Sequence, residues 1–219
     1  MNNKIVYAVV LIIAFLISLF FSFYDFNGLP KPSVTGGERG VLGIDKNINE
    51  KTIDKYLNRS DSVYRDMRML KDPARYSNIG GDSNLSGFIK GFEVVSFPYL
   101  TEVKGLPPEV GSTYTGRTLF SEDSNGDFVP NYEESMDILE YLFPKDKNIF
   151  LICGGGGYAG MTKNLLVSLG WDSNKIYNIG GYWYYDGPNK VEVKRGDKFD
   201  FWKVPYHDID FDSLTEVKW

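Results

Sequence analysis

The sequence predicts an α/β domain in which helices flank a mostly parallel β-sheet, preceded by one membrane-spanning helix. Three observations lead to this prediction. Residues 5–23 form an uncharged apolar run, and residues 148–152 form a short apolar strand that ends at a glycine run. Predicted strands and helices then alternate along the second half of the chain. Such alternation is typical of a parallel sheet that is covered on both faces.

The N-terminal apolar run, residues 5–23, is long enough to cross a bilayer. As a helix it would measure about 28 Å, close to the thickness of the hydrocarbon core. The bulky residues 20–24 offer no small-residue cleavage site, which favours an uncleaved anchor at residues 1–26 over a signal peptide or a buried core helix. Lys4 before the run and Asp25 after it predict a cell-membrane protein whose domain lies outside the cytoplasm.

A linker rich in Gly and Pro, residues 27–43, is expected to connect this anchor to a single domain, residues 44–219. The 219-residue chain has a net charge of −5, with acidic and basic residues interspersed, so a nucleic-acid partner is not expected. A single cysteine excludes an internal disulfide, and a resolving thiol would have to come from another molecule. No cofactor and no metal ion are predicted.

The first half of the domain is predicted to contain short elements. Apolar spacing predicts a helix at residues 50–58 and a strand at residues 62–66, followed by the turn-rich residues 67–84. A second strand is expected at residues 88–95. The polar stretch at about residues 101–130 is longer than ordinary connections and is interpreted as an insertion or a lid.

The second half of the domain has a more regular pattern. Asn131 is predicted to cap a helix in which Glu134 completes a capping box. The next elements are a strand at residues 148–152, a helix at about residues 159–169 and a strand at residues 175–179. Residues 190–219 are expected to form edge strands packed by Trp202 and Trp219.

The only cysteine, Cys153, lies where the strand ends and the glycine run begins. Loop N–H groups and the positive end of a helix dipole both favour a thiolate over a thiol. Cys153 is therefore predicted to be a nucleophile, and its anion is expected to be held by Gly154, Gly155, Gly156, Gly157, Tyr158 and Ala159. The alternative is a buried structural cysteine. Four consecutive glycines favour the reactive loop, because glycine serves where a backbone takes positive φ or approaches a ligand.

Several segments, in their order along the chain, resemble the rhodanese-like domain, an α/β fold whose active loop begins with a cysteine at a strand end. The segments are residues 63–68, with Asp66 and Arg68 in an Asp-X-Arg pattern, residues 87–92, with Phe88 where histidine is common, and residues 149–181, with the cysteine loop and a closing Gly-Gly pair. No single segment is decisive, but their order is specific. The resemblance covers about residues 50–187.

The resemblance implies a membrane-anchored sulfurtransferase that carries a persulfide on Cys153. Its thiolate would attack the outer sulfur of a small donor such as thiosulfate, and a thiol acceptor would later remove that sulfur. Asp66 is interpreted as a structural partner near the loop. Arg68 or Arg117 could replace the arginine that the loop lacks, but surface or structural ion pairs are the favoured interpretation for both residues. The uncharged loop and Phe88 support a second hypothesis, a non-catalytic rhodanese-like binding or redox-sensing module.

A weaker pattern concerns calcium. Asp123, Asn125, Asp127 and Glu134 have the spacing of ligands in a calcium-binding loop. Phe128, however, occupies the position where such loops need glycine. A plain turn followed by a helix cap is the favoured interpretation.

Two further groups of residues are expected to be structural. His207 is the only histidine, so it cannot build a zinc site without other soft ligands, and a solvated side chain is expected. Residues 182–185 are all aromatic and could rim a pocket or close the core. Core closure is the favoured interpretation, because large aromatic side chains are commonly recruited for it.

Overall fold

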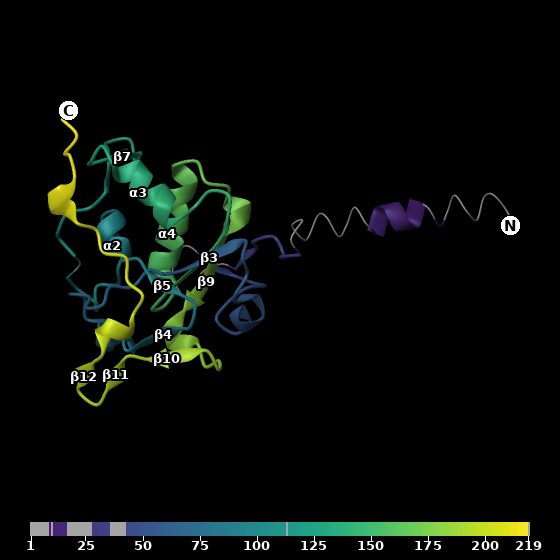
Figure 1. Cartoon of the computed structure of the whole chain (residues 1–219), viewed down its shortest axis with the longest axis horizontal. Helices are drawn as coiled ribbons and strands as arrows, with labels where there is room; N and C mark the ends of the chain where they lie inside the picture. The colour runs from purple at the N-terminus through teal and green to yellow at the C-terminus, as the bar shows by residue number, and fades with distance from the viewer. Residues whose placement is uncertain (1–8, 10, 17–27, 36–42, 113, 219) are drawn as a thin grey trace.

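The centre of the fold is a four-stranded parallel sheet with the strand order β5–β3–β8–β9. Figure 1 labels β3, β5 and β9 of this sheet at the centre of the domain. The computed structural model describes residues 9, 11–16, 28–35, 43–112 and 114–218. The sheet strands are β3 (Ser62–Asp66), β5 (Glu93–Val94), β8 (Asn148–Cys153) and β9 (Ile176–Gly181). The helices are α2 (Phe97–Leu100), α3 (Ser135–Leu142) and α4 (Gly157–Ser168). The α4 helix packs against both β8 and β9.

The predicted fold class, a rhodanese-like mostly parallel sheet flanked by helices and preceded by a membrane-spanning helix, is wrong. The described residues form mixed sheets, because two-stranded antiparallel sheets accompany the parallel one. These pairs are β1 (Val34–Thr35) with β2 (Ile44–Asp45), β4 (Gly87–Ile89) with β10 (Lys190–Glu192), β6 (Phe120–Glu122) with β7 (Phe128–Pro130), and β11 (Lys194–Arg195) with β12 (Lys198–Phe199).

The structure describes only part of the predicted membrane span. Within the part of the chain that the structure describes, no helix is both long enough and apolar enough to cross a bilayer. Most of the predicted span, residues 5–23, lies outside the described residues, and so does much of the predicted linker, residues 27–43. Within that linker, Leu29 is fully buried in the core. The membrane location of the protein stays a prediction.

A single glycine explains why the expected strand at residues 88–95 is two strands. Gly91 has a φ of +95°, a conformation that side-chain-bearing residues rarely adopt, and it turns the chain between β4 and β5. The Phe92 N–H donates to the Ile89 carbonyl across this turn at 3.0 Å. As a result β4 pairs antiparallel with β10, while β5 joins the parallel sheet beside β3.

The alternation of side chains along β8 decides which way Cys153 faces. Ile149, Leu151 and Cys153 pack in one core cluster together with residues of α3 and α4. Phe150 and Ile152 pack in a second cluster on the other side of the sheet. Because successive side chains of a strand point to opposite faces, Cys153 lies on the α4 side of the sheet.

The second cluster is held by stacked aromatic rings from three neighbouring strands. Phe150 lies between Tyr64 and Tyr177, with ring centroids 5.1 and 4.9 Å apart, respectively. Both contacts are offset or near-parallel arrangements that stabilise a core beyond simple area burial. The stacked rings therefore link three neighbouring strands of the sheet that carries the cysteine loop.

The predicted capping box before α3 is wrong. The Asn131 side chain donates to the backbone carbonyl and hydroxyl of Thr118, and the Glu134 carboxylate accepts from Thr215. Neither side chain is free to cap the helix, and α3 (Ser135–Leu142) begins after Glu134 without a side-chain cap.

Several predicted elements of the periphery also differ. The helix expected at residues 50–58 is a short 3-10 helix, η1 (Ile53–Tyr56). The other 3-10 helices are η2 (Tyr76–Ile79), η3 (Ser173–Lys175), η4 (Tyr182–Tyr184), η5 (Phe201–Lys203) and η6 (Phe211–Ser213). Trp202 is 81% exposed, so the expectation that it packs the C-terminal segment is wrong. Trp219 lies outside the described residues.

Candidate functional site

The sulfur of Cys153 lies at the N-terminus of α4 and takes the place of a capping side chain. The N-cap residue of this helix is Gly156, which has no side chain that could act as a cap. The Gly156 N–H instead donates to Cys153 Sγ at 3.1 Å, and the N–H groups of Tyr158 and Ala159 also act on the sulfur. Helix N-termini leave unpaired N–H groups and carry partial positive charge, so this position favours a negative charge on sulfur.

The loop carbonyls are turned away from the sulfur because other groups hold them. The Trp183 N–H donates to the Gly154 carbonyl at 3.2 Å. The Asn178 side chain donates to the Gly156 carbonyl at 3.1 Å, and its Oδ1 accepts from the Gly180 N–H. Asn178 is thus a positioning residue for the loop, and no pattern in the sequence singled it out.

Two of the four glycines are required by geometry. Gly156 has a φ of +104°, in the left-handed region that favours glycine. The Trp183 indole lies directly over Gly154, where an added Cβ would come within 2.6 Å of Trp183 Cε2. By contrast, a Cβ on Gly157 would meet no atom within 4 Å. Trp183 therefore covers the loop. The favoured expectation for residues 182–185 is core closure, but the Trp183 side chain also lines a pocket beside the loop.

The pKa of Cys153 moves in the direction opposite to the prediction. Burial of the thiol raises its pKa above the ordinary value, and the negative charge of Asp66 adds to this effect. The N–H groups of Ala159, Gly156 and Tyr158 lower the pKa but do not overcome burial. Only 3% of Cys153 is exposed, so the desolvation of a thiolate outweighs the amide cradle.

Asp66 and Arg68 form a buried ion pair beside the loop. Arg68 Nε and Nη2 both donate to the Asp66 carboxylate, and Nη2 also donates to the Gly87 carbonyl at 2.7 Å. The guanidinium carbon lies 4.3 Å from the ring centroid of Tyr182. Asp66 is fully buried and Arg68 is 7% exposed, so the charge of Arg68 is largely compensated before any ligand arrives.

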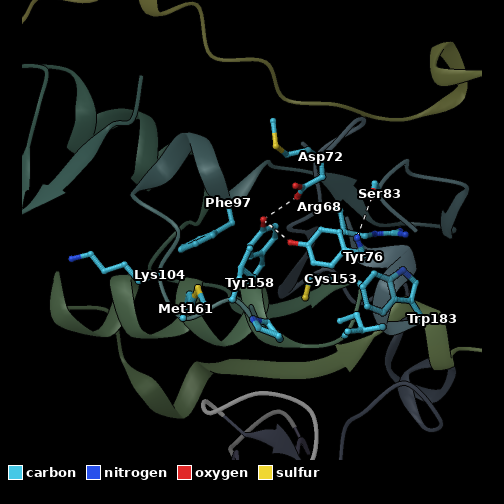
Figure 2. A pocket seen from close by; sticks show the side chains of 18 of the residues that line it. Arg68, Asp72, Tyr76, Ser83, Phe97, Lys104, Cys153, Tyr158, Met161 and Trp183 are labelled. Atoms are coloured by element: carbon cyan, nitrogen blue, oxygen red, sulfur yellow. Dashed lines mark hydrogen bonds between the residues drawn. The ribbon is translucent and has the colours of Figure 1, made fainter. Parts of the chain in front are cut away.

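A pocket of about 740 Å³ opens beside Cys153 (Figure 2). Its loop wall consists of Cys153, Gly154, Gly155, Gly157, Tyr158 and Met161. Its side-chain wall comes from residues 68–85 and 97–107, with Trp183 at one side. Figure 2 shows the Cys153 sulfur in the interval between the side chains of Tyr158 and Trp183. The predicted loop thus lies at a cavity that can hold a small molecule.

A chain of hydrogen bonds joins the two walls. Tyr76 donates to the Tyr158 hydroxyl at 2.8 Å, and Tyr158 donates to Asp72 Oδ2 at 2.9 Å (Figure 2). Burial raises the pKa of all three groups, so both hydroxyls keep their protons at neutral pH. Tyr76 and Asp72 were missed by sequence reasoning, because residues 67–84 show only turn composition. The stretch at about residues 101–130, expected to be an insertion or a lid, also contributes to the pocket lining.

The other residues singled out from the sequence lie elsewhere. Arg117 pairs with Asp212 on the surface and does not line the pocket. His207 Nε2 lies 2.9 Å from Glu93 Oε2 and is likewise absent from the lining.

The calcium pattern is a turn. Asp123 Oδ1 accepts the N–H groups of Asn125 and Asp127 at 2.8 and 2.9 Å. The Glu134 carboxylate accepts from Thr215 instead of facing this loop. Among the described residues, no group of His, Cys, Asp or Glu side chains is arranged to hold a metal ion.

Comparison with known proteins leaves the function to be argued from this geometry. No family model, no curated protein and no solved structure matches the chain. The resemblance to rhodanese-like domains therefore stays a prediction that depends on the segments around Asp66, Phe88 and Cys153.

Proposed function

We propose that this protein is a sulfane-sulfur carrier with chemistry of the rhodanese type. Cys153 would hold a persulfide between a small donor and a thiol acceptor. The observation that supports this proposal is the position of Cys153 Sγ, which contacts the N-terminal amides of α4 and borders a pocket of about 740 Å³. A nucleophile, oriented N–H donors and a cavity for the substrate are the parts that group transfer requires.

The transfer can be written with all atoms and electrons accounted for. The Cys153 thiolate attacks the outer sulfur of the donor, and a new S–S bond forms as the S–S bond of the donor breaks. The leaving group departs with the electron pair of that bond; from thiosulfate it is sulfite. An acceptor thiolate then attacks the terminal sulfur and becomes a persulfide, while Cys153 leaves as a thiolate. No outside oxidant or reductant is needed.

The loop amides are placed to assist each step. Negative charge stays close to the cysteine sulfur, or one bond away on the terminal sulfur of the persulfide. The Gly156 N–H and the first N–H groups of α4 can donate to that charge without reorganisation. The loop carbonyls would repel this negative charge, but Asn178 and Trp183 hold two of them in hydrogen bonds directed away from the sulfur.

Sulfur loading tests the proposal directly. The full chain is incubated with a panel of donors, namely thiosulfate, methanethiosulfonate and benzenethiosulfonate, and its intact mass is recorded before and after treatment with a thiol. We expect a gain of one sulfur atom that the thiol removes, and no gain in Cys153→Ser. Oxidation to a sulfinic acid adds a similar mass, but thiols do not reverse it. If none of the donors produces a reversible gain, the proposed function is wrong.

A second function is favoured by the state of the thiol. Burial raises the pKa of Cys153, and the loop carries no charged side chain, which suits a non-catalytic binding or redox-sensing module. The pH dependence of alkylation probes this state. Because the pKa is raised above the ordinary value of 9.0, little thiolate exists at pH 7, and the alkylation rate should still be rising above pH 9.

The two measurements together separate the two functions. A rate that still rises above pH 9, with no sulfur loading by any donor, would favour the binding module. Loading by at least one donor would favour the carrier, and its rate should then increase with pH in parallel with alkylation. An alkylation rate that levels off below pH 8 would contradict the effect of burial on Cys153.

A further inference from the structure

We infer that the pocket beside Cys153 selects sulfur donors that carry an apolar group and little negative charge, over the inorganic dianion thiosulfate. This inference rests on the proposed function and names the donor class of the same site. It follows from the side chains that line the pocket and from the charges among them.

The interior of the pocket is mostly apolar. Phe97 and Leu85 line it and are each 1% exposed, and Met161 and Trp183 add further carbon and sulfur surface near the loop. The rim includes Ile79, which is 46% exposed despite its apolar side chain. Such a lining stabilises an apolar group of a ligand, since its transfer from water removes apolar surface from solvent.

The ionised side chains of the lining are predominantly acidic. Within the described part of the chain, four carboxylates line the pocket: Asp72, Asp82, Glu102 and Glu122. Among the described residues, only two cations, Arg68 and Lys104, line the same cavity. A ligand with two negative charges therefore enters a field that repels it, and the effect increases where water is excluded.

Both cations already have carboxylate partners. Arg68 is bonded to the buried Asp66, which lies behind it. Lys104 Nζ lies 2.5 Å from Glu122 Oε2 and 3.9 Å from a Glu102 oxygen. To bind a dianion, either cation would have to divide its interaction between its carboxylate partner and the ligand, or to break its existing ion pair. Uncharged backbone N–H groups at the loop suffice for the single negative charge of a thiosulfonate.

A series of three donors tests this selectivity. Thiosulfate is a dianion without an organic group, methanethiosulfonate is a monoanion with a methyl group, and benzenethiosulfonate is a monoanion with a phenyl ring. In the proposed reaction, each donor would transfer its outer sulfur to Cys153 and release sulfite, methanesulfinate or benzenesulfinate, respectively. The comparison of the two monoanions isolates the apolar contribution, and the comparison of methanethiosulfonate with thiosulfate addresses the charge.

For the full chain we expect kcat/KM for sulfur loading to rise in the order thiosulfate, methanethiosulfonate, benzenethiosulfonate. The phenyl ring should raise kcat/KM at least about tenfold over the methyl group, since it buries several more carbon atoms. Each donor is also measured with a small thiol of the same intrinsic reactivity, so that chemical differences between donors are divided out. If thiosulfate equals or exceeds benzenethiosulfonate after this correction, the inference is wrong while the proposed function stands.

A charge variant provides an independent check. Asp82→Asn removes one negative charge from the lining but keeps the Oδ1 atom that accepts from the Asn84 N–H at 2.9 Å. It should raise kcat/KM for thiosulfate about two- to fivefold, with a smaller change for the monoanions. Asp197→Asn, which does not line the pocket, is the matched control and should change neither. An equal effect of both variants would contradict the inference. Failure of every donor to load Cys153 would overturn the proposed function itself.

Discussion

The two walls of the pocket are built in different ways. On the loop wall, the groups that face the sulfur are backbone N–H groups, placed by a strand, a glycine turn and a helix that are continuous in sequence. On the side-chain wall, the working groups are the side chains of residues 68–85 and 97–107, which include only short elements such as η2 and α2. The loop wall depends on backbone geometry, and the side-chain wall depends on partners that are distant in sequence.

The largest effect is expected at Arg68, a residue of the side-chain wall that bonds both Asp66 of β3 and Gly87 of β4. Arg68→Ala would leave the buried Asp66 carboxylate without its counter-charge, and we expect a loss of about 3–5 kcal/mol in the free energy of unfolding. Arg117→Ala is the control, because its pair with Asp212 is exposed to solvent. Urea unfolding measures both variants. Equal losses would mean that the Asp66–Arg68 pair does not support the site.

A smaller effect is expected within the loop wall, and it differs between two neighbouring glycines. In Gly154→Ala the new Cβ would overlap the Trp183 ring, which also packs on Gly81, so we expect a loss of about 2–3 kcal/mol. In Gly157→Ala the Cβ points into open space at the start of α4, and the free energy of unfolding should rise by up to about 1 kcal/mol.

The same pair of glycine variants bears on the geometry of the loop. If Trp183 covers Gly154 as described, Gly154→Ala should also increase the exposure of the Trp183 indole. The fluorescence emission of Trp183 reports this exposure, and it is obtained as the difference between spectra recorded with Trp183 and with Trp183→Phe. Should Gly154→Ala and Gly157→Ala have the same stability, the contact between Trp183 and the loop would be ruled out as a constraint.

The smallest loss of stability is expected at Tyr158, where the two walls meet. Tyr158→Phe removes the hydroxyl that donates to Asp72 and accepts from Tyr76, and it leaves two partly buried groups with one partner fewer. We expect a loss of about 1–2 kcal/mol in the free energy of unfolding. Tyr141→Phe, at a side chain that is 72% exposed, is the control and should leave stability unchanged. A neutral Tyr158→Phe would show that the hydrogen-bond chain does not couple the walls.

The elements of the loop wall could be predicted because their signals are local. The strand at residues 148–152, the helix at residues 159–169 and the strand at residues 175–179 agree with β8, α4 and β9 to within two residues at each end. Apolar runs and glycine punctuation act over only a few residues, so they can be recognised without knowing the rest of the fold. The N-terminal contact of Cys153 with α4 follows from the same local order.

The side-chain wall could not be predicted, because its residues acquire their roles from partners far along the chain. Tyr76 and Asp72 meet Tyr158 across more than eighty positions. Gly91 turns the chain between β4 and β5, but the antiparallel partner of β4 is β10, about a hundred residues later, and no local pattern indicates that pairing. Asn131 and Glu134 have the spacing of a capping box. In the structure, however, the Asn131 side chain donates to Thr118, and the Glu134 carboxylate accepts from Thr215.

The sequence by itself determined that the single thiol of this chain lies at the end of a strand, before a glycine turn and a helix, because those preferences are set by neighbouring residues. The tertiary structure decided the ionisation of that thiol. Burial under the packed core and the nearby charge of Asp66 raise the pKa of Cys153 despite the loop amides. The tertiary structure also decided that the pocket has an apolar and acidic lining, since desolvation and ion pairing depend on groups that only folding brings together.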